Sequence, residues 1–120
     1  MRVTMQELAK PGFIKGLRED SSSILIKAVV ERDWQEVLKL LRSTVKFNIN
    51  VEVDQDRNTT LHFAVFYGQK EVVEKLIEAG AEVNKEDRSG NTPFHWAVLY
   101  GQKEIAELLA NKMGLPIEIV

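Results

Sequence analysis

The 120-residue chain contains no cysteine, which excludes disulfide bridges, zinc–thiolate sites and thiol chemistry. No apolar run approaches the roughly 20 residues that a membrane-spanning helix needs, and residues 1–11 lack the apolar stretch of a signal peptide. Neither sign of charge dominates, because 16 Lys and Arg stand against 18 Asp and Glu. We therefore expect an intracellular protein, cytoplasmic or nuclear, with neither nucleic acid nor a membrane as its partner.

The sequence does have a hydrophobic content of 44% and an internal repeat. The segment that starts at Asn58 recurs 33 positions later at Asn91, and between Asn58 and Leu76 the two copies are identical at 12 of 19 positions. A fixed period of this length is typical of proteins built from stacked structural units. The chain is thus expected to be one folded array of similar units.

Each copy has the pattern of two short helices. Thr59 and Thr92 are suitable N-caps, Pro93 suits the first position of a helix, and Gly68 and Gly101 suit a helix end. The second helix of each copy is predicted over residues 70–79 and 103–112. The first helices carry apolar residues at the spacing of one helix face: Leu61, Ala64, Val65, Phe94, Ala97 and Val98. Helices this short are marginal alone, so the pairs must pack on one another.

A more divergent unit precedes these two copies. The apolar residues 24–30 predict its first helix, and Asp33 with Glu36 resembles a capping box that opens a second helix over 34–42. Alternation of apolar and polar residues within 43–57 favours a short extended hairpin. Residues 1–20 do not repeat, and we expect either two short helical turns that cap the stack or a frayed tail.

The segment Thr92-Pro93-Phe94-His95-Trp96-Ala97 resembles the Thr-Pro-Leu-His-x-Ala signature of the ankyrin repeat. Segment 101–105 is similar to the start of that family's second helix, and segment 78–84 to its inter-repeat turn. The resemblance covers about 54–113, with a weaker repeat upstream. The chain departs from the family pattern at Thr60 in place of proline, at Arg57 in place of glycine, and at Gln69 and Gln102 in place of histidine.

The resemblance implies an all-α ankyrin-repeat solenoid of about three helix-turn-helix repeats, with short hairpin loops and an N-terminal helical cap. The expected parts are the cap at 1–20, a divergent first repeat with a long loop at 21–53, repeats at 54–86 and 87–114, and an apolar tail at 115–120.

It also implies that the concave face and the hairpin tips bind another protein. On this basis the candidate protein-binding residues are Phe66, Tyr67, Leu99 and Tyr100 on the first helices, with Gln55, Asp56, Arg88 and Ser89 on the tips. Exposed aromatic residues are favoured anchors of interfaces. The alternative is that neighbouring repeats bury these side chains, which is the expectation for Phe63, Phe94 and Trp96.

No pattern of catalytic or metal-binding residues stands out. His62 and His95 each lie three residues after a capping threonine, so a hydrogen bond between the two side chains is the expected role. Glu71 and Glu104 suit the first turn of a helix. We expect no catalysis, no cofactor and no metal site, with a site shared between two copies as the remaining alternative. The basic residues alternate with acids and predict a solvated surface.

The sequence therefore favours a protein-interaction module that acts as an adaptor or an inhibitor. The alternative is a structural or assembly role. The tail Leu115-Pro116-Ile117-Glu118-Ile119-Val120 is apolar where a terminal repeat is normally polar, so it folds back, pairs with a second copy, or continues into a longer array.

Overall fold

The computed structural model describes residues 21–115, and over this range the chain forms six helices. The cap expected at 1–20 and the tail expected from Pro116 onward lie outside the described residues. The helices are α2 (Ser22–Val30), α3 (Trp34–Arg42), α4 (Thr60–Phe66), α5 (Lys70–Glu78), α6 (Pro93–Leu99) and α7 (Lys103–Met113).

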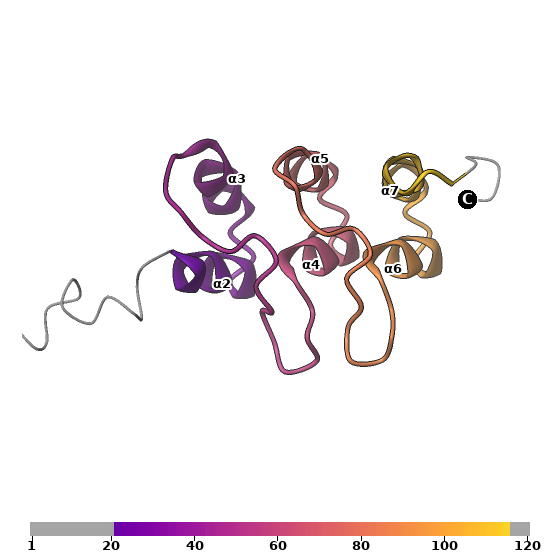
Figure 1. The fold of residues 1–120 in the computed structure, drawn as a ribbon, viewed down its shortest axis with the longest axis horizontal. Coiled ribbons are helices and arrows are strands. Elements are labelled where there is room, and N and C mark those ends of the chain that lie inside the picture. Colours follow the sequence, from indigo (N-terminus) through magenta and orange to yellow (C-terminus); the bar gives the residue numbers. More distant parts are fainter. Residues whose placement is uncertain (1–20, 116–120) are drawn as a thin grey trace, which may run out of the picture.

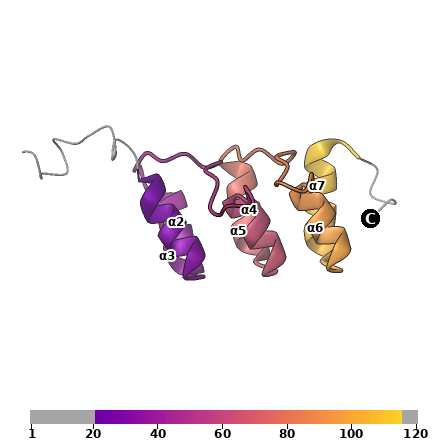
Figure 2. The same ribbon diagram turned by 90° about the horizontal axis from the view of Figure 1, so that it is seen from below.

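The helices form three hairpins that stack side by side. Helices α2, α4 and α6 make one row and α3, α5 and α7 make a second row, while the loops that join the repeats project beyond the first row (Figure 1). Within each hairpin the two helices contact each other, and each helix also contacts its counterpart in the next hairpin. Seen from below, the three pairs follow one another along the long axis (Figure 2). The expected all-α solenoid is confirmed.

The core lies between the two rows and between successive repeats. Its fully buried side chains come from all three hairpins and include Leu25, Val29, Val37, Leu61, Val65, Val72, Leu76 and Leu109. Removing each of these side chains from water contributes roughly 1.5–3 kcal/mol. The stack is therefore held by apolar contacts that no single hairpin could make.

The helix ends are set by local chemistry, as the sequence predicts. The Asp33 carboxylate accepts a hydrogen bond from the backbone N–H of Glu36 at 3.2 Å, which caps α3. Pro93 opens α6, where its missing N–H has no partner to lose. Gly68 and Gly101 follow α4 and α6 in the left-handed conformation, with φ of 68° and 69°.

The long loop of the first repeat differs from the extended hairpin predicted over 43–57. Within the described residues this segment pairs only through one isolated bridge, between Glu52 and Thr59. Its backbone instead bonds to the start of α2, where Ser21 N–H donates to the Lys46 carbonyl at 2.6 Å and Asn48 N–H donates to Ser22 Oγ at 2.8 Å. The alternating apolar side chains pack onto the hydrophobic core instead of forming a sheet face, namely Phe47, Ile49, Val51 and Val53.

Thr60 occupies the position that Pro93 has in the third repeat. Its hydroxyl is buried and has no hydrogen-bond partner. Its N–H, at the first position of α4, has no intrahelical acceptor. Thr59 is extended, at φ −98° and ψ 175°, which suits a residue before proline. We predict that Thr60→Pro raises the free energy of unfolding by about 1 kcal/mol, by removing the orphaned hydroxyl and stiffening the unfolded chain.

Urea denaturation followed by circular dichroism measures this change. Thr60→Val is the matched control, because it removes the hydroxyl and leaves the backbone free. The difference between the two variants then reports the contribution of the proline ring. A lower stability for both variants would contradict the assignment of the hydroxyl as unsatisfied.

Candidate protein-interaction surface

His62 holds the start of α4 and the junction with the next repeat at once. Its Nδ1 atom accepts a hydrogen bond from the Thr59 backbone N–H at 3.1 Å, while Thr59 Oγ1 accepts one from the His62 backbone N–H at 3.4 Å. The other ring nitrogen, Nε2, lies 3.0 Å from the carbonyl oxygen of Asn91, so it carries the proton and donates it. The expected threonine–histidine pair is therefore present, and it also bonds to the third repeat.

Burial lowers the pKa of His62 below its ordinary value of 6.5, although the Asn91 carbonyl and the charge of Asp87 act in the opposite direction. The neutral ring matches its hydrogen bonds, because Nδ1 must remain an acceptor for Thr59. His62 is thus a structural residue between two repeats, in agreement with the sequence interpretation.

The third repeat has the same cap, and within residues 21–115 its histidine bonds to no other repeat. His95 Nδ1 accepts from the Thr92 backbone N–H at 3.0 Å, but the His95 side chain is exposed. Val98 is 52% exposed, whereas its counterpart Val65 is fully buried. Within the described range, the end face of the stack at α6 therefore presents apolar side chains to solvent.

A chain of aromatic rings runs along the first row of helices. Phe66 is at its centre and meets three rings edge-to-face: Tyr67 with ring centroids 4.9 Å apart, Tyr100 at 5.1 Å and Trp96 at 5.6 Å. Trp96 stacks on Tyr100 at 5.4 Å. Because these rings come from α4 and α6 and from the residues that follow them, the stacking of the two repeats brings them together.

Four candidate residues on the first helices are partly exposed: Phe66 is 40%, Tyr67 36%, Tyr100 49% and Leu99 71% exposed. One network of rings joins Phe66, Tyr67 and Tyr100. Leu99 is aliphatic and is not part of this network. Phe63, Phe94 and Trp96 are only half-buried and pack against the core. We name the exposed set Phe66, Tyr67 and Tyr100, with Trp96 beneath them, the aromatic face.

The four candidate residues on the hairpin tips are exposed on two loops that are tied to each other. The Arg88 guanidinium donates to the Gln55 carbonyl from Nε at 3.1 Å and from Nη2 at 2.7 Å, and the Arg88 backbone N–H donates to the Asp56 carbonyl at 2.7 Å. Ser89 N–H donates to Asp87 Oδ1 at 2.9 Å. The guanidinium of Arg88 thus already joins the tips, whereas the side chains of Gln55 and Asp56 face solvent.

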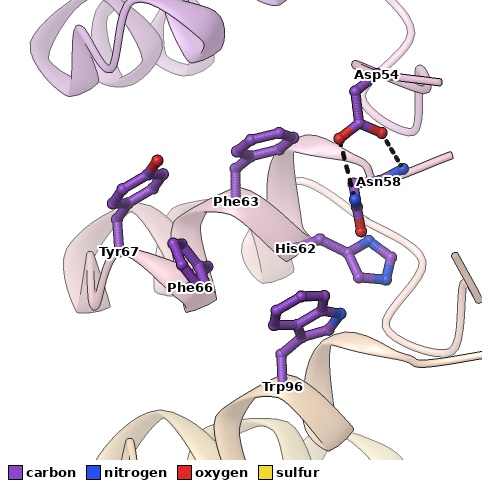
Figure 3. A pocket seen from close by; sticks show the side chains of 7 residues that line it. All are labelled: Asp54, Asn58, His62, Phe63, Phe66, Tyr67 and Trp96. Atoms are coloured by element: carbon purple, nitrogen blue, oxygen red, sulfur yellow. Dashed lines mark hydrogen bonds between the residues drawn. The ribbon is translucent and has the colours of Figure 1, made fainter. Parts of the chain in front are cut away.

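A cavity of about 150 Å³ lies between α4 and α6, and the sequence analysis did not anticipate it. Figure 3 shows its aromatic side, formed by Phe63, Phe66, Tyr67 and Trp96, and its polar end, formed by Asp54, Asn58 and His62. A second feature that was missed is Trp34 of α3, whose ring lies 6.1 Å from that of Tyr67. Both depend on contacts between repeats, for which the sequence carries no local signal.

Two overlapping matches to a family model described as ankyrin repeats (3 copies) cover residues 4–87 and 36–119. The chain belongs to the ankyrin-repeat family. Proteins of this family are typically non-enzymatic modules that bind other proteins, which agrees with the coarse function that the sequence predicts.

One similar relative is a putative ankyrin repeat protein of fowlpox virus (strain NVSL), FPV219. It is 42% identical over 62 residues, and this alignment covers 50% of the present chain. It covers only 14% of the viral protein, so the likeness concerns ankyrin repeats within a much longer chain.

The polar groups of the described ankyrin repeats were compared with the needs of a metal ion, a membrane and the fold. Between residues 21 and 115, no cluster of three or more His, Asp or Glu side chains is arranged to hold a metal ion. Over the same range, none of the helices is both long enough and apolar enough to cross a membrane. Asp87 serves the fold: it accepts from Trp96 Nε1 at 3.1 Å and from the backbone N–H groups of Ser89 and Asn91.

The lowered pKa of His62 predicts a pH-dependent stability. The unfolded chain takes up a proton near pH 6.5, whereas the folded chain resists protonation until lower pH. The contribution of His62 to stability is therefore complete above about pH 6.5 and is lost as the pH falls through the folded pKa. We expect the free energy of unfolding to fall as the pH is lowered from about 6.5 in urea titrations.

Two glutamine variants test this prediction. His62→Gln keeps an amide that can serve the cap but cannot titrate, and it should remove most of the pH dependence in this window. His95→Gln makes the same change at the equivalent cap, where the side chain is exposed, and it should retain the dependence. Equal slopes for the wild type and His62→Gln would show that another group is responsible.

Proposed function

We propose that this ankyrin-repeat chain binds a partner protein through the aromatic face, and acts as an adaptor or an inhibitor by occupying the partner's surface. The observation that carries the proposal is the exposed ring network around Phe66, in which three ring contacts at 4.9–5.6 Å hold solvent-exposed side chains in fixed positions. Contiguous exposed apolar side chains mark interaction surfaces.

The chemistry of the aromatic face supports binding to protein. Tyr67 and Tyr100 are both exposed. Among residues 21–115, neither hydroxyl makes a hydrogen bond to another group, so each side chain combines an apolar ring with an unpaired polar tip. Aromatic side chains of this kind give large contact areas and lose little conformational freedom, because neighbouring rings already restrain them. The face is therefore preorganised for association.

The hairpin tips extend the same proposal with polar contacts. Gln55, Asp56 and Ser89 are exposed on loops that Arg88 joins by its bonds to the Gln55 carbonyl. Loops fixed in this way would present amide, carboxylate and hydroxyl groups at the rim of the apolar surface. A polar rim around an apolar centre is the usual anatomy of a protein interface.

The experiment is a pull-down of proteins from cells that express the chain, followed by measurement of the Kd for each protein recovered. Tyr67→Ala combined with Tyr100→Ala is expected to weaken binding about 30-fold, as loss of central aromatic anchors does. Lys75→Ala combined with Glu78→Ala, on the second row of helices at α5, is the control and should leave the Kd unchanged.

Circular dichroism of each variant separates binding from folding. If the Tyr67 and Tyr100 double variant unfolds, the rings are part of the fold, and the interpretation that neighbouring repeats bury them is correct. A folded double variant with unchanged affinity would move the interface to the tips or to the end of the stack.

A second candidate is self-association through the end face at α6, because Val98 and Leu99 are exposed there while Val65 is buried at the equivalent place. We expect Val98→Glu to shift any concentration-dependent mass in light scattering to that of one chain. A mass of one chain at high micromolar concentration in the wild type would contradict self-association.

A further inference from the structure

One residue that lines the cavity between α4 and α6, Asn58, carries a polar atom without a partner. Asn58 Oδ1 is buried and accepts no hydrogen bond. The amide orientation is fixed by its other end, since Nδ2 donates to Asp54 Oδ2 at 3.0 Å, and a flipped amide would place two oxygens together. Figure 3 shows the amide oxygen turned away from Asp54, toward His62 and Trp96.

Leaving a carbonyl oxygen buried without a donor is costly, and native structures contain few such groups. Here the orphaned acceptor belongs to a residue that lines a cavity, and four aromatic side chains line the same cavity: Phe63, Phe66, Tyr67 and Trp96. A ligand group that enters the cavity can therefore contact aromatic rings and approach the amide of Asn58.

The charges around the cavity favour a cation. Asp54 lines it, and Asp87 accepts a hydrogen bond from the indole of Trp96, which lines it too. The nearby ammonium of Lys85 is paired with Glu52, with Nζ 3.6 Å from Oε2. No cationic side chain lines the cavity itself. Aromatic faces attract cations through their ring quadrupoles, so the walls and the carboxylates act in the same direction.

The molecule already packs one guanidinium on this surface. Arg32 lies with Cζ 5.4 Å from the ring centroid of Tyr67, a contact that leaves the cavity free because Arg32 does not line it. A guanidinium is planar, can stack on a ring, and carries several N–H donors in one plane. The donors of an ammonium do not lie in one plane. A volume of about 150 Å³ accommodates one such group.

We propose that the cavity between α4 and α6 receives an arginine side chain of the partner protein, which stacks among Phe63, Phe66 and Trp96 and donates hydrogen bonds to Asn58 Oδ1 and the Asp54 carboxylate. This inference rests on the proposed function, because it names the chemistry of the partner residue that the aromatic face surrounds. It also assigns Asn58 a role in recognition that the fold alone does not give.

The test needs no identified partner. The full chain, labelled with ¹⁵N, is titrated with N-acetyl-arginine amide, and the indole N–H resonance of Trp96 is followed by NMR, with Trp34→Phe used to assign it. We expect a saturable shift with a Kd on the order of 10 mM. N-acetyl-citrulline amide, which has the same shape without charge, should bind roughly tenfold more weakly.

N-acetyl-lysine amide distinguishes the two natural cations, and it too should bind more weakly than the arginine probe. Equal binding of the lysine probe would overturn the assignment to arginine. Equal binding of the citrulline probe, or no saturable shift of the Trp96 indole, would overturn the cation site altogether.

Two variants tie binding to the cavity. Asn58→Ala removes the acceptor and should weaken the arginine probe roughly tenfold, whereas Asn91→Ala, the same change one repeat later and outside the cavity, should not. Phe66→Leu keeps an apolar side chain but removes the ring, and it should also weaken binding. If Asn58→Ala perturbs the fold, seen as widespread amide shifts, Phe66→Leu decides: an unchanged Kd there overturns the proposal.

The result is separable from that of the pull-down. A partner that depends on Tyr67 and Tyr100, with no arginine binding, would leave the interaction surface standing and remove the arginine cavity. Saturable arginine binding, with no partner that depends on those tyrosines, would support the cavity and contradict the wider interface.

Discussion

Packing of each helix pair on the next is the constraint on which the rest of this structure depends. The longest described helix has 11 residues, and helices of this length do not persist alone in water. The contact between the second and third repeats combines buried apolar side chains with a buried polar link, the His62 Nε2–H to Asn91 carbonyl bond of 3.0 Å. Exposed polar links at the tips and between Lys70 and Glu104 add to it. Because His62 is buried among apolar side chains, that link adds direction to the packing and helps to fix how far α6 lies along α4.

The same contact creates the aromatic face. Phe66 belongs to α4, while Trp96 and Tyr100 belong to the next repeat, yet their centroids lie within 5.6 Å of each other. A period of 33 residues places equivalent side chains in columns, so a surface larger than any one hairpin arises from short and local elements. Binding and folding are therefore coupled, because loosening the junction between repeats would separate the rings that form the surface.

Sequence reasoning succeeded where the cause was local and failed where it was not. The start of α3 after Asp33 and the left-handed Gly68 and Gly101 follow from neighbouring residues, and so did the pairing of Thr59 with His62. The hairpin predicted within 43–57 occurs only at the end of that segment, at the Glu52–Thr59 bridge, because most of the alternation reflects packing on the core instead of strand pairing. The cavity and the orphaned Asn58 oxygen were missed, since both need residues from two repeats at once.

Arg57 has φ of 66° where the third repeat has Gly90, and its ion pair with Glu52 at 3.0 Å accompanies this strained conformation.

The differences between the repeats decide where recognition can occur. Positions that are identical in the two copies, such as Thr59, His62 and Gly68, serve caps and helix ends, and any repeat could supply them. The cavity instead uses the aromatic side chains of Phe63, Phe66 and Trp96. In the first repeat, 36 positions earlier, Lys27 stands in place of Phe63 and Val30 in place of Phe66. Lys27 is positively charged and Val30 is aliphatic, so neither can form an aromatic wall around a cation. The junction between α4 and α6 is thus chemically distinct from the junction between α2 and α4, so the described repeats can offer one aromatic cavity, and a bound partner would be held in a single register along the stack.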